Sequence, residues 1–292
     1  MRHWCEYVAV RALQAILNTL PMRAARRAGV WLGRIAFVVD GRHRRTAIDN
    51  LTKAFPGKAP DELRQLAKRV FEHFGSVLLE LLRFGGYSRE EMLAAVEFDG
   101  VERAEAAYAQ GRGVLFVTGH FGYWEMHAIA NALNGRPVAV LARPLDNPRL
   151  HAMLEGIRTM TGNAVVMRQG AVRRMLQDLA ANRGIAVLID QHLHTPDAVH
   201  VDYFGRPVAT TSAVAALALR TGAVVLPVFA LPLPGGRYRL VYEHPVPPPS
   251  ADSPDAVKEF TQRCTDVLEM YVRRNPELWL WMHRRWRERD TA

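Results

Sequence analysis

The feature that most constrains the fold is a series of short apolar runs separated by longer segments with helical periodicity. The runs are rich in β-branched residues and occupy positions 114–118, 138–141, 164–167, 185–189 and 224–229. Runs of this length suit strands that are buried on both faces, and the segments between the first four are long enough for the helical crossovers that parallel strands require. The sequence therefore predicts an α/β fold with a mostly parallel central sheet flanked by helices.

Further helices are expected on both sides of this region of the chain. After Asp61, apolar residues recur every three or four positions as far as Gly85 and Gly86, which predicts a long core-facing helix. A C-terminal helix is expected over 254–273, after a proline-rich connector. The remaining expected elements are a loop or hairpin at 190–205, a helix at 211–221 and a final strand at 238–243.

The first 60 residues differ from the rest in charge. Residues 1–58 contain eleven Lys/Arg and three Asp/Glu, so they hold nearly all of the net charge of +9. Two stretches, 4–20 and 28–39, place apolar residues on one helical face and polar residues on the other. We therefore divide the chain into a basic amphipathic helical segment at 1–60, expected to associate with a membrane, and an α/β domain at 61–292.

The charge of this segment alone is compatible with three partners, which are nucleic acid, an anionic membrane surface and an acidic substrate. An anionic membrane surface would attract its arginines while the apolar faces enter the headgroup region. Alternatively, the helices form a hairpin that packs on the protein's own domain. Nucleic acid is not expected as a partner, because no recognised nucleic-acid motif accompanies the charge and Trp4, Trp31 and Phe37 fit the apolar helical faces. No window offers the roughly 18 uninterrupted apolar residues of a membrane span.

Cysteines and histidines give no indication of a metal or redox site. Cys5 and Cys264 lie far apart and lack the spacing of a zinc site or a disulfide framework, which indicates a reducing compartment. His192, His194 and His200 lie near acidic residues, but their spacing matches no metal motif, so we expect a polar loop and no metal. The N-terminal stretch is interrupted by polar residues and has no small-residue cleavage site, so secretion is not expected.

Three tryptophans stand beside arginines near the end of the chain. Trp279, Trp281 and Trp286 could form an interfacial belt, a wall for an acyl chain, or a segment that docks on the core. We expect docking.

The segment with the clearest chemical signal follows the first predicted strand and reads Gly-His-Phe-Gly-Tyr-Trp-Glu at positions 119–125. His120 therefore lies at the carboxyl end of a strand, where α/β sheets bind ligands. Five residues of regular helix turn through about 500°, so His120 and Glu125 can pair only across a nonhelical turn, which Gly122 permits. The carboxylate could then accept the imidazole Nδ1–H and leave Nε2 to take a proton. Alternatively, His120 caps the following helix and Glu125 is a solvated first-turn residue.

This segment resembles the His-x4-Asp/Glu motif of the glycerolipid and lysophospholipid acyltransferase superfamily, and most closely the lipid A biosynthesis acyltransferases of the lauroyl/myristoyl branch. Further blocks match in the same order. They are Ala142-Arg143-Pro144 with Asn147-Pro148, Asp190-Gln191, Tyr203-Phe204-Gly205-Arg206-Pro207 with Thr210, and Leu226-Pro227. Segments near both ends also match, at Asn50-Leu51 with Phe55-Pro56 and at Pro276 through Trp286, so the resemblance covers almost the whole chain.

The resemblance implies an O-acyltransferase that moves a fatty-acyl chain from an acyl thioester to a hydroxyl of a lipid A precursor. His120 would be the general base and Glu125 would orient it. The implied substrate-binding residues are Arg143, Asn147, Asp190, Gln191 and Arg168, of which Arg143, and more weakly Arg168, would hold an anionic group. The donor would be acyl carrier protein, or else coenzyme A, and no cofactor is expected. The implied location is the cytoplasmic face of the bacterial inner membrane, peripheral or shallowly inserted.

The reaction is better indicated than the acceptor. The chain has no Gly-x-Ser-x-Gly elbow and no cysteine near His120, so we expect direct transfer without a covalent acyl-enzyme. A lysophospholipid, a glycolipid mannoside or another envelope lipid fits the motifs as an alternative acceptor. A noncatalytic lipid-binding protein is disfavoured because both His120 and Glu125 are present.

Overall fold

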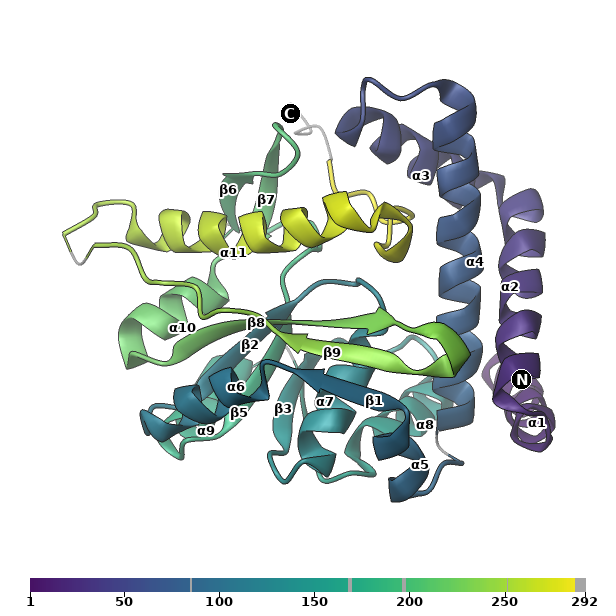
Figure 1. Cartoon of the computed structure of the whole chain (residues 1–292), viewed down its shortest axis with the longest axis horizontal. Helices are drawn as coiled ribbons and strands as arrows, with labels where there is room; N and C mark the ends of the chain where they lie inside the picture. The colour runs from purple at the N-terminus through teal and green to yellow at the C-terminus, as the bar shows by residue number, and fades with distance from the viewer. Residues whose placement is uncertain (85, 168–169, 196–197, 251, 287–292) are drawn as a thin grey trace.

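A seven-stranded sheet forms the centre of the molecule (Figure 1). The computed structural model describes residues 1–84, 86–167, 170–195, 198–250 and 252–286. Its strands are β1 (Val96–Asp99), β2 (Val114–Thr118), β3 (Val138–Ala142), β4 (Ala164–Met167), β5 (Gly184–Leu188), β8 (Val224–Pro232) and β9 (Tyr238–Tyr242). Their order is β1-β9-β8-β2-β5-β3-β4, and all neighbours are parallel apart from the antiparallel pair of β8 and β9. The predicted α/β fold with a mostly parallel sheet is confirmed.

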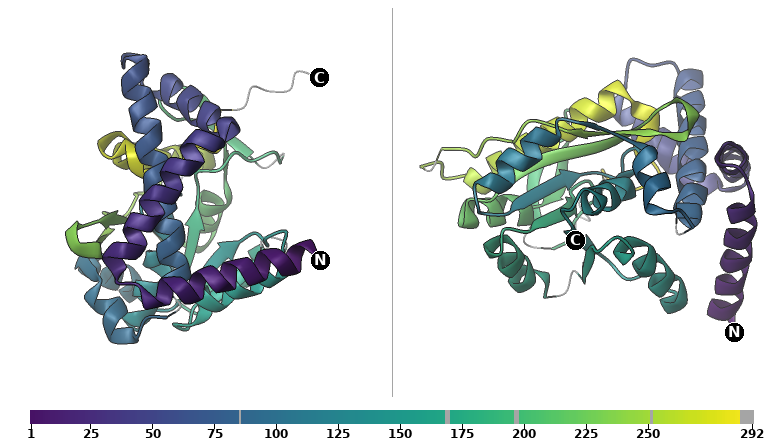
Figure 2. Two further views of the ribbon diagram at one scale, coloured as in Figure 1. Left: turned by 90° about the vertical axis from the view of Figure 1, so that its right-hand side faces the viewer. Right: turned by 60° about the horizontal axis from the view of Figure 1, so that its bottom comes forward.

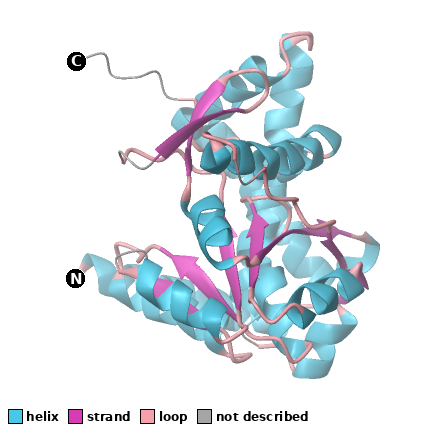
Figure 3. Ribbon diagram, turned by 90° about the vertical axis from the view of Figure 1, so that its left-hand side faces the viewer, coloured by secondary structure: helices cyan, strands magenta, loops and turns pink. Residues whose placement is uncertain are grey.

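Helices cover both faces of this sheet (Figure 3), which explains why its central strands are apolar along their whole length. Leu115 and Val117 point into one buried cluster, whereas Val114 and Phe116 point into the other. The first cluster includes residues of α9 (Ala171–Ala180), α10 (Ala213–Thr221) and α11 (Ala256–Arg274), and the second includes residues of α5 (Arg89–Ala94), α6 (Val101–Ala109) and α7 (Trp124–Leu133). The site-bearing loops are thus held by a three-layer core.

The parallel strands β2, β5, β3 and β4 end at the same edge of the sheet. Thr118 lies opposite Leu188 in the register, and Ile189 N donates to Thr118 O at 3.0 Å. The residues that follow β2 and β5 therefore emerge side by side. This places the loop of His120 next to the loop of Asp190.

A two-stranded antiparallel hairpin, β6 (Ala198–Asp202) and β7 (Pro207–Thr211), follows β5 and packs against α11. It corresponds to the loop or hairpin expected from the sequence. Phe204 at its tip has a positive φ of 57° and donates its N–H to Glu269 Oε2 of α11 at 2.6 Å. The hairpin is therefore fixed to the helix layer above the sheet.

The N-terminal part is helical, as expected, and consists of α1 (Arg2–Thr19), α2 (Met22–Val39), α3 (Gly41–Ala54) and α4 (Pro60–Phe84). The backbones of helices α2 and α4 approach closely at Gly33, where a Cβ atom would lie only 2.1 Å from Phe71 O. Glycine permits this approach because it has no side chain. Ala47 and Leu51 of α3 belong to the same buried cluster as the sheet. Part of segment 1–60 is therefore built into the core of the α/β domain, and the membrane association of that segment stays a prediction.

The outer face of α2 carries apolar side chains in solvent. Trp31, Ile35, Val38 and Val39 are 56–74% exposed. Figure 2 shows α1 and α2 on the outside of α4, at one side of the molecule. In the described parts of the chain, no helix is both long and apolar enough to cross a membrane. Helix α1 also runs beside α8 (Pro148–Thr159), the helix between β3 and β4.

The last described segment begins with the short 3-10 helix η2 (Pro276–Leu278) and returns along the core; a second, η1 (Pro234–Gly236), joins β8 to β9. Trp279 and Trp281 are at most 1% exposed. Phe121 and Trp279 form an isolated antiparallel bridge between this segment and the loop after β2. The expectation that the tryptophan-rich end docks on the core is confirmed.

Candidate active site

His120 and Asp190 form the centre of the site, at the carboxyl ends of the neighbouring strands β2 and β5. His120 Nδ1 lies 2.8 Å from Asp190 Oδ1. The other carboxylate oxygen, Oδ2, accepts the backbone N–H of His120 at 2.6 Å and the indole N–H of Trp279 at 2.9 Å. The carboxylate is 3% exposed, so three donors surround it in an environment with almost no water.

Protonation in this pair follows from its contacts. Burial opposes a charge on Asp190, but the His120 imidazole and the surrounding N–H donors lower the pKa of this carboxyl to about 2. Burial also opposes the charged form of His120, yet the charge and hydrogen bond of Asp190 outweigh it and raise the pKa of the imidazole above 6.5. Because an ionised carboxylate only accepts hydrogen bonds, Nδ1 carries the proton and Nε2 of the neutral ring has a lone pair.

The residues beside the His120 ring leave part of it exposed. Gln191 Nε2 lies 3.5 Å from His120 Nε2, a distance too long for a strong hydrogen bond. The ring of Trp124 lies 5.2 Å from the imidazole, tilted by 57°. The His120 side chain is 19% exposed. Among the described residues, Nε2 therefore has no short hydrogen bond, and the side chain is partly accessible to solvent.

Glu125 does not make the hydrogen bond to His120 Nδ1 that the His-x4-Glu spacing predicted. Its two oxygens bind Arg158 of α8 instead, at 2.5 Å to Nη2 and 3.0 Å to Nε. Glu125 lies in the first turn of α7, which directs the side chain towards α8, while Asp190 reaches Nδ1 from the adjacent strand. The charge of Glu125 still contributes to raising the pKa of His120. The orienting partner in the structure is thus Asp190, which the sequence indicated only as a substrate-binding residue.

The nonhelical turn predicted at Gly122 is present. Gly122 has φ of +58°, and a Cβ at this position would lie 2.0 Å from Ala230 O. Its N–H donates to Leu278 O at 2.9 Å, and Tyr123 N donates to Ala230 O at 3.1 Å. Only glycine combines this positive φ with so close a backbone approach, so the turn that carries His120 is rigid.

The other predicted substrate-binding residues occupy different places. Arg143 is exposed just after β3, at the same edge of the sheet as His120. Asn147 is 5% exposed and caps α8, accepting from Arg149 N at 3.0 Å and donating to His3 O and Glu6 Oε2 of α1. Arg168 lies outside the described residues. The structure therefore brings His120, Asp190 and Gln191 together and uses Asn147 for a contact between helices.

Two residues contact the site in a way that the sequence did not predict. Arg158 belongs to α8, 33 positions after Glu125, and no local pattern marked it. Trp279 lies 89 positions after Asp190; the family resemblance included its segment, but periodicity and spacing gave no reason to place its indole on that carboxylate. Both contacts depend on the tertiary fold.

An apolar groove of about 430 Å³ opens beside the turn of His120, between α2, α4 and the segment after η2. Leu280 lines the groove, and its N–H donates to His120 O at 3.0 Å. Phe74 lines it as well and lies 5.9 Å from the ring of Trp124, which in turn neighbours the imidazole. The groove therefore adjoins His120 through the backbone of Leu280 and the ring of Trp124.

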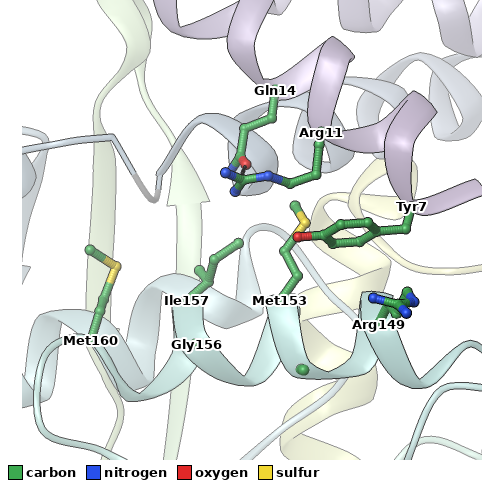
Figure 4. A pocket seen from close by; sticks show the side chains of 9 residues that line it. Tyr7, Arg11, Gln14, Arg149, Met153, Gly156, Ile157 and Met160 are labelled. Carbon is green, nitrogen blue, oxygen red and sulfur yellow. Dashed lines mark hydrogen bonds between the residues drawn. The ribbon is translucent and has the colours of Figure 1, made fainter. Parts of the chain in front are cut away.

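A second groove, of about 500 Å³, lies between α1 and α8 (Figure 4). Tyr7 and Arg11 point into it from α1, and Met153 and Ile157 face them from α8. Arg11 Nη1 donates to Gln14 Oε1 at 2.8 Å. Arg158, which binds Glu125, belongs to the same helix α8 but does not line this groove, so we describe the groove as a separate surface feature.

Within the described ranges, no three His, Cys, Asp or Glu side chains lie in an arrangement that could hold a metal ion. His192 and His194 are near neighbours, with ring centroids 4.4 Å apart, and His192 N donates to His283 Nε2 at 3.2 Å. These contacts tie the loop after β5 to the C-terminal segment. The absence of a metal in the reaction stays a prediction.

The chain is similar in sequence to several acyltransferases. The chain is 25% identical to a lipid A biosynthesis lauroyltransferase of Escherichia coli (strain K12), over all of the chain and 94% of that protein. It is 23% identical to a lipid A biosynthesis myristoyltransferase of the same organism, over 96% of the chain and 86% of that protein. A phosphatidylinositol mannoside acyltransferase of Mycolicibacterium smegmatis is 25% identical, over 79% of the chain and 74% of its own length.

The model of one protein family, the bacterial lipid A biosynthesis acyltransferases, matches residues 1–288, almost the whole chain. The match extends over the N-terminal helices, the sheet and the C-terminal segment alike. The protein is therefore an acyltransferase, and it belongs to the bacterial lipid A biosynthesis acyltransferase family.

Proposed function

We propose that this acyltransferase moves a fatty-acyl chain from an acyl thioester to a hydroxyl of a lipid A precursor, with His120 as general base. The observation that carries the proposal is the state of His120. Its Nδ1 is bound to the buried, ionised Asp190 at 2.8 Å, which leaves Nε2 with a lone pair, and the side chain is 19% exposed. The family to which the chain belongs supports lipid A as the acceptor class.

The proposed reaction needs only one proton carrier. As the acceptor oxygen attacks the thioester carbonyl, its proton passes to Nε2 of His120, and the C–O bond forms. The tetrahedral intermediate then collapses, the C–S bond breaks, and the leaving thiolate takes the proton back from the imidazolium. The products are an ester and a free thiol, with His120 restored to its neutral form. A thioester is already activated, so no acyl-enzyme is required.

Asp190 acts by orienting and stabilising His120. Its carboxylate fixes the Nδ1–H tautomer and lowers the free energy of the imidazolium that forms during transfer. Gln191, whose amide nitrogen lies 3.5 Å from Nε2, is placed to donate to the acceptor oxygen or to the developing oxyanion. Glu125 adds a second negative charge near His120 while neutralising Arg158.

The apolar groove beside His120 suits the acyl chain of the donor. Leu280, which lines it, donates its N–H to His120 O, and Phe74, which also lines it, neighbours Trp124 beside the imidazole. Arg143, exposed at the same edge of the sheet, is available for an anionic group of the lipid acceptor or of the donor's carrier. The proposed donor is an acyl carrier protein, whose acidic surface would complement the net charge of +9, or else an acyl-coenzyme A. No cofactor takes part in this scheme.

We further propose that the protein binds peripherally to the cytoplasmic face of the bacterial inner membrane through α1 and α2. The exposed apolar face of α2 would enter the headgroup region, and the arginines that flank it would meet anionic lipid. This arrangement would place the mouth of the groove between α2 and α4 at the membrane surface, where the acceptor lipid lies.

The test is a product analysis with competing substrates. Membrane-bound enzyme is incubated with acyl carrier protein and coenzyme A thioesters of several chain lengths, together with a lipid A precursor, a lysophospholipid and a phosphatidylinositol mannoside. Mass spectrometry should find one acyl chain added to the lipid A precursor. A mass gain on another acceptor, with none on the precursor, would reject lipid A as the substrate, and the mannoside-specific relative makes that comparison informative.

A further inference from the structure

The segment 278–286 contacts both loops of the active site, and we call it the C-terminal clamp. Its first contacts are with the loop of His120. Leu280 N donates to His120 O at 3.0 Å, and Leu278 O accepts from Gly122 N at 2.9 Å. These bonds hold the backbone on both sides of His120, so the clamp helps to fix the direction of the imidazole.

The same clamp also holds the loop that follows β5. The Trp279 indole N–H donates to Asp190 Oδ2 at 2.9 Å. Arg285 Nη1 donates to Gln191 O at 3.0 Å. The two loops lie 70 residues apart in sequence, and the clamp is a third segment that joins them through hydrogen bonds.

Arg285 is unusual because its charge is buried without a paired carboxylate among the residues that the structure describes. It is 1% exposed, and it forms no ion pair with any residue that the structure describes. Its guanidinium donates to Gln191 O, to Ala209 O at 2.8 Å and to Thr210 Oγ1 at 2.5 Å. Burying a cation in this way is costly, and docking of the segment alone would be served by an apolar side chain. Arg285 binds Gln191 O and lies near enough to Asp190 for its charge to act on that carboxylate, so its charge can influence the catalytic pair.

We propose that the C-terminal clamp aligns the two catalytic loops, with Trp279 and Arg285 as positioning residues for the His120–Asp190 pair. Neither side chain touches the substrate; both act through Asp190 and Gln191. The functional part of this proposal rests on the proposed role of His120 as general base. The structural part, that the clamp controls the environment of the imidazole, can be measured without turnover.

The charged and titratable groups around the pair determine the direction of the effect. His120 faces Asp190, Glu125 and Arg158, and Asp190 also lies near Tyr203 and Arg285. Removing the Trp279 N–H takes one donor from the Asp190 carboxylate and concentrates its charge on the bond to His120. The imidazolium becomes more favourable, so the pKa of His120 should rise.

The first experiment compares Trp279→Phe with Trp281→Phe. Both residues are fully buried in the same segment and each loses one indole hydrogen bond, but the Trp281 N–H donates to Pro276 O and not to an active-site residue. NMR titration of the His120 ring, assigned with His120→Gln, should show a pKa about 0.5–1 unit higher in Trp279→Phe. Trp281→Phe should leave the pKa unchanged at a comparable loss of melting temperature. Equal His120 titrations in the two variants would overturn the proposal.

The second experiment uses Arg285→Lys and Arg285→Met. Lysine keeps the charge but cannot reproduce the two-pronged contact with Gln191 O and Thr210, whereas methionine removes the charge as well. The His120 pKa should rise in Arg285→Met and stay close to wild type in Arg285→Lys, while kcat falls about tenfold or more in both. Unchanged kcat and pKa in folded Arg285→Met would overturn the proposal. If the pKa shifts as expected but the wild-type pH–rate profile has no limb at the His120 pKa, the clamp is supported and the general-base role is rejected.

Discussion

Replacing Asp190 by asparagine separates the two candidate partners of His120. The carboxylate accepts three hydrogen bonds, from Nδ1–H of His120, from the backbone N–H of His120 and from Trp279 Nε1–H. An amide supplies only one oxygen. If this oxygen faces the backbone and indole donors, the NH₂ group faces Nδ1 and forces the ring into the Nε2–H tautomer, which cannot accept a proton from the acceptor hydroxyl.

The expected losses of activity and of stability in Asp190→Asn follow from the same contacts. In a comparable His–Asp arrangement, an Asp-to-Asn change that removes the reactive tautomer lowers kcat by about 10⁴. We therefore expect kcat to fall by about 10³–10⁴, which raises the activation free energy by about 4–5.5 kcal/mol. The pKa of Asp190, about 2 instead of 3.8, also means that its charge stabilises the fold above pH 4 and loses this effect as the pH falls towards 2. The Asp190→Asn substitution should therefore lower the free energy of unfolding at pH 7 by about 2 kcal/mol.

The assay is initial-rate transfer from a thioester at saturating substrates, measured from pH 5 to 9, with urea denaturation as a folding control. In wild type, activity should rise with pH through a limb above 6.5, because Asp190 and Glu125 raise the pKa of His120 and only the neutral imidazole is a base. In Asp190→Asn this limb should move to lower pH while the plateau falls. A folded Asp190→Asn enzyme with wild-type kcat and an unmoved limb would refute the reasoning.

Three further predictions concern other parts of the molecule. Glu125→Gln should lower the free energy of unfolding by about 2–3 kcal/mol, because Arg158 loses its counter-charge. In NMR titrations this change should lower the His120 pKa by less than Asp190→Asn does. A larger decrease of the His120 pKa in Glu125→Gln would show that Glu125 is its main partner. His127 is 2% exposed, and burial lowers its pKa to about 3. Below pH 6.5 this histidine is protonated only in the unfolded chain, so the free energy of unfolding should fall by about 2 kcal/mol between pH 7 and pH 5. Urea denaturation of His127→Leu should no longer show this loss. Ile35→Glu should reduce the fraction of protein that sediments with phosphatidylglycerol vesicles, without changing the melting temperature. Val172→Glu, at an equally exposed position on α9, should leave that fraction unchanged. Equal binding by both variants would show that α2 does not contact the membrane.

The strands could be predicted closely because each is a short apolar run bounded by breakers. The expected runs at 114–118 and 164–167 coincide with β2 and β4, and the others agree within a few residues. The strand β1 was missed, since Val-Glu-Phe-Asp at the edge of the sheet has a single buried residue at its start and two charges among four residues. Helix α3 was also not separated from its neighbours, because its arginines suggested a flanking segment, whereas its small residues pack into the core.

The active site could be predicted in part. The motif placed His120 correctly at the end of β2, and the resemblance identified Asp190 and Gln191 as part of the site. The sequence did not show which carboxylate contacts Nδ1. The spacing within one segment gives no information about residues that strand pairing brings in from elsewhere in the chain. Pairing of β2 with β5 brings Asp190 to the imidazole, and α8 takes Glu125 away from it. Asn147 illustrates the same limit, since its capping and interhelical bonds depend on where α1 lies.

The most direct test of the central claim is the rate at which thiol and acylated lipid appear together, in wild type and in His120→Gln. Glutamine is close in size to histidine, and its folding can be checked by urea denaturation. The account predicts one acylated lipid for each thiol released by the wild-type enzyme, with no acylated protein detected by intact mass, and a rate at least about 10³-fold lower for the folded variant. Transfer by His120→Gln at the wild-type rate, or an acyl group on the protein that forms and decays as fast as the lipid product appears, would contradict it.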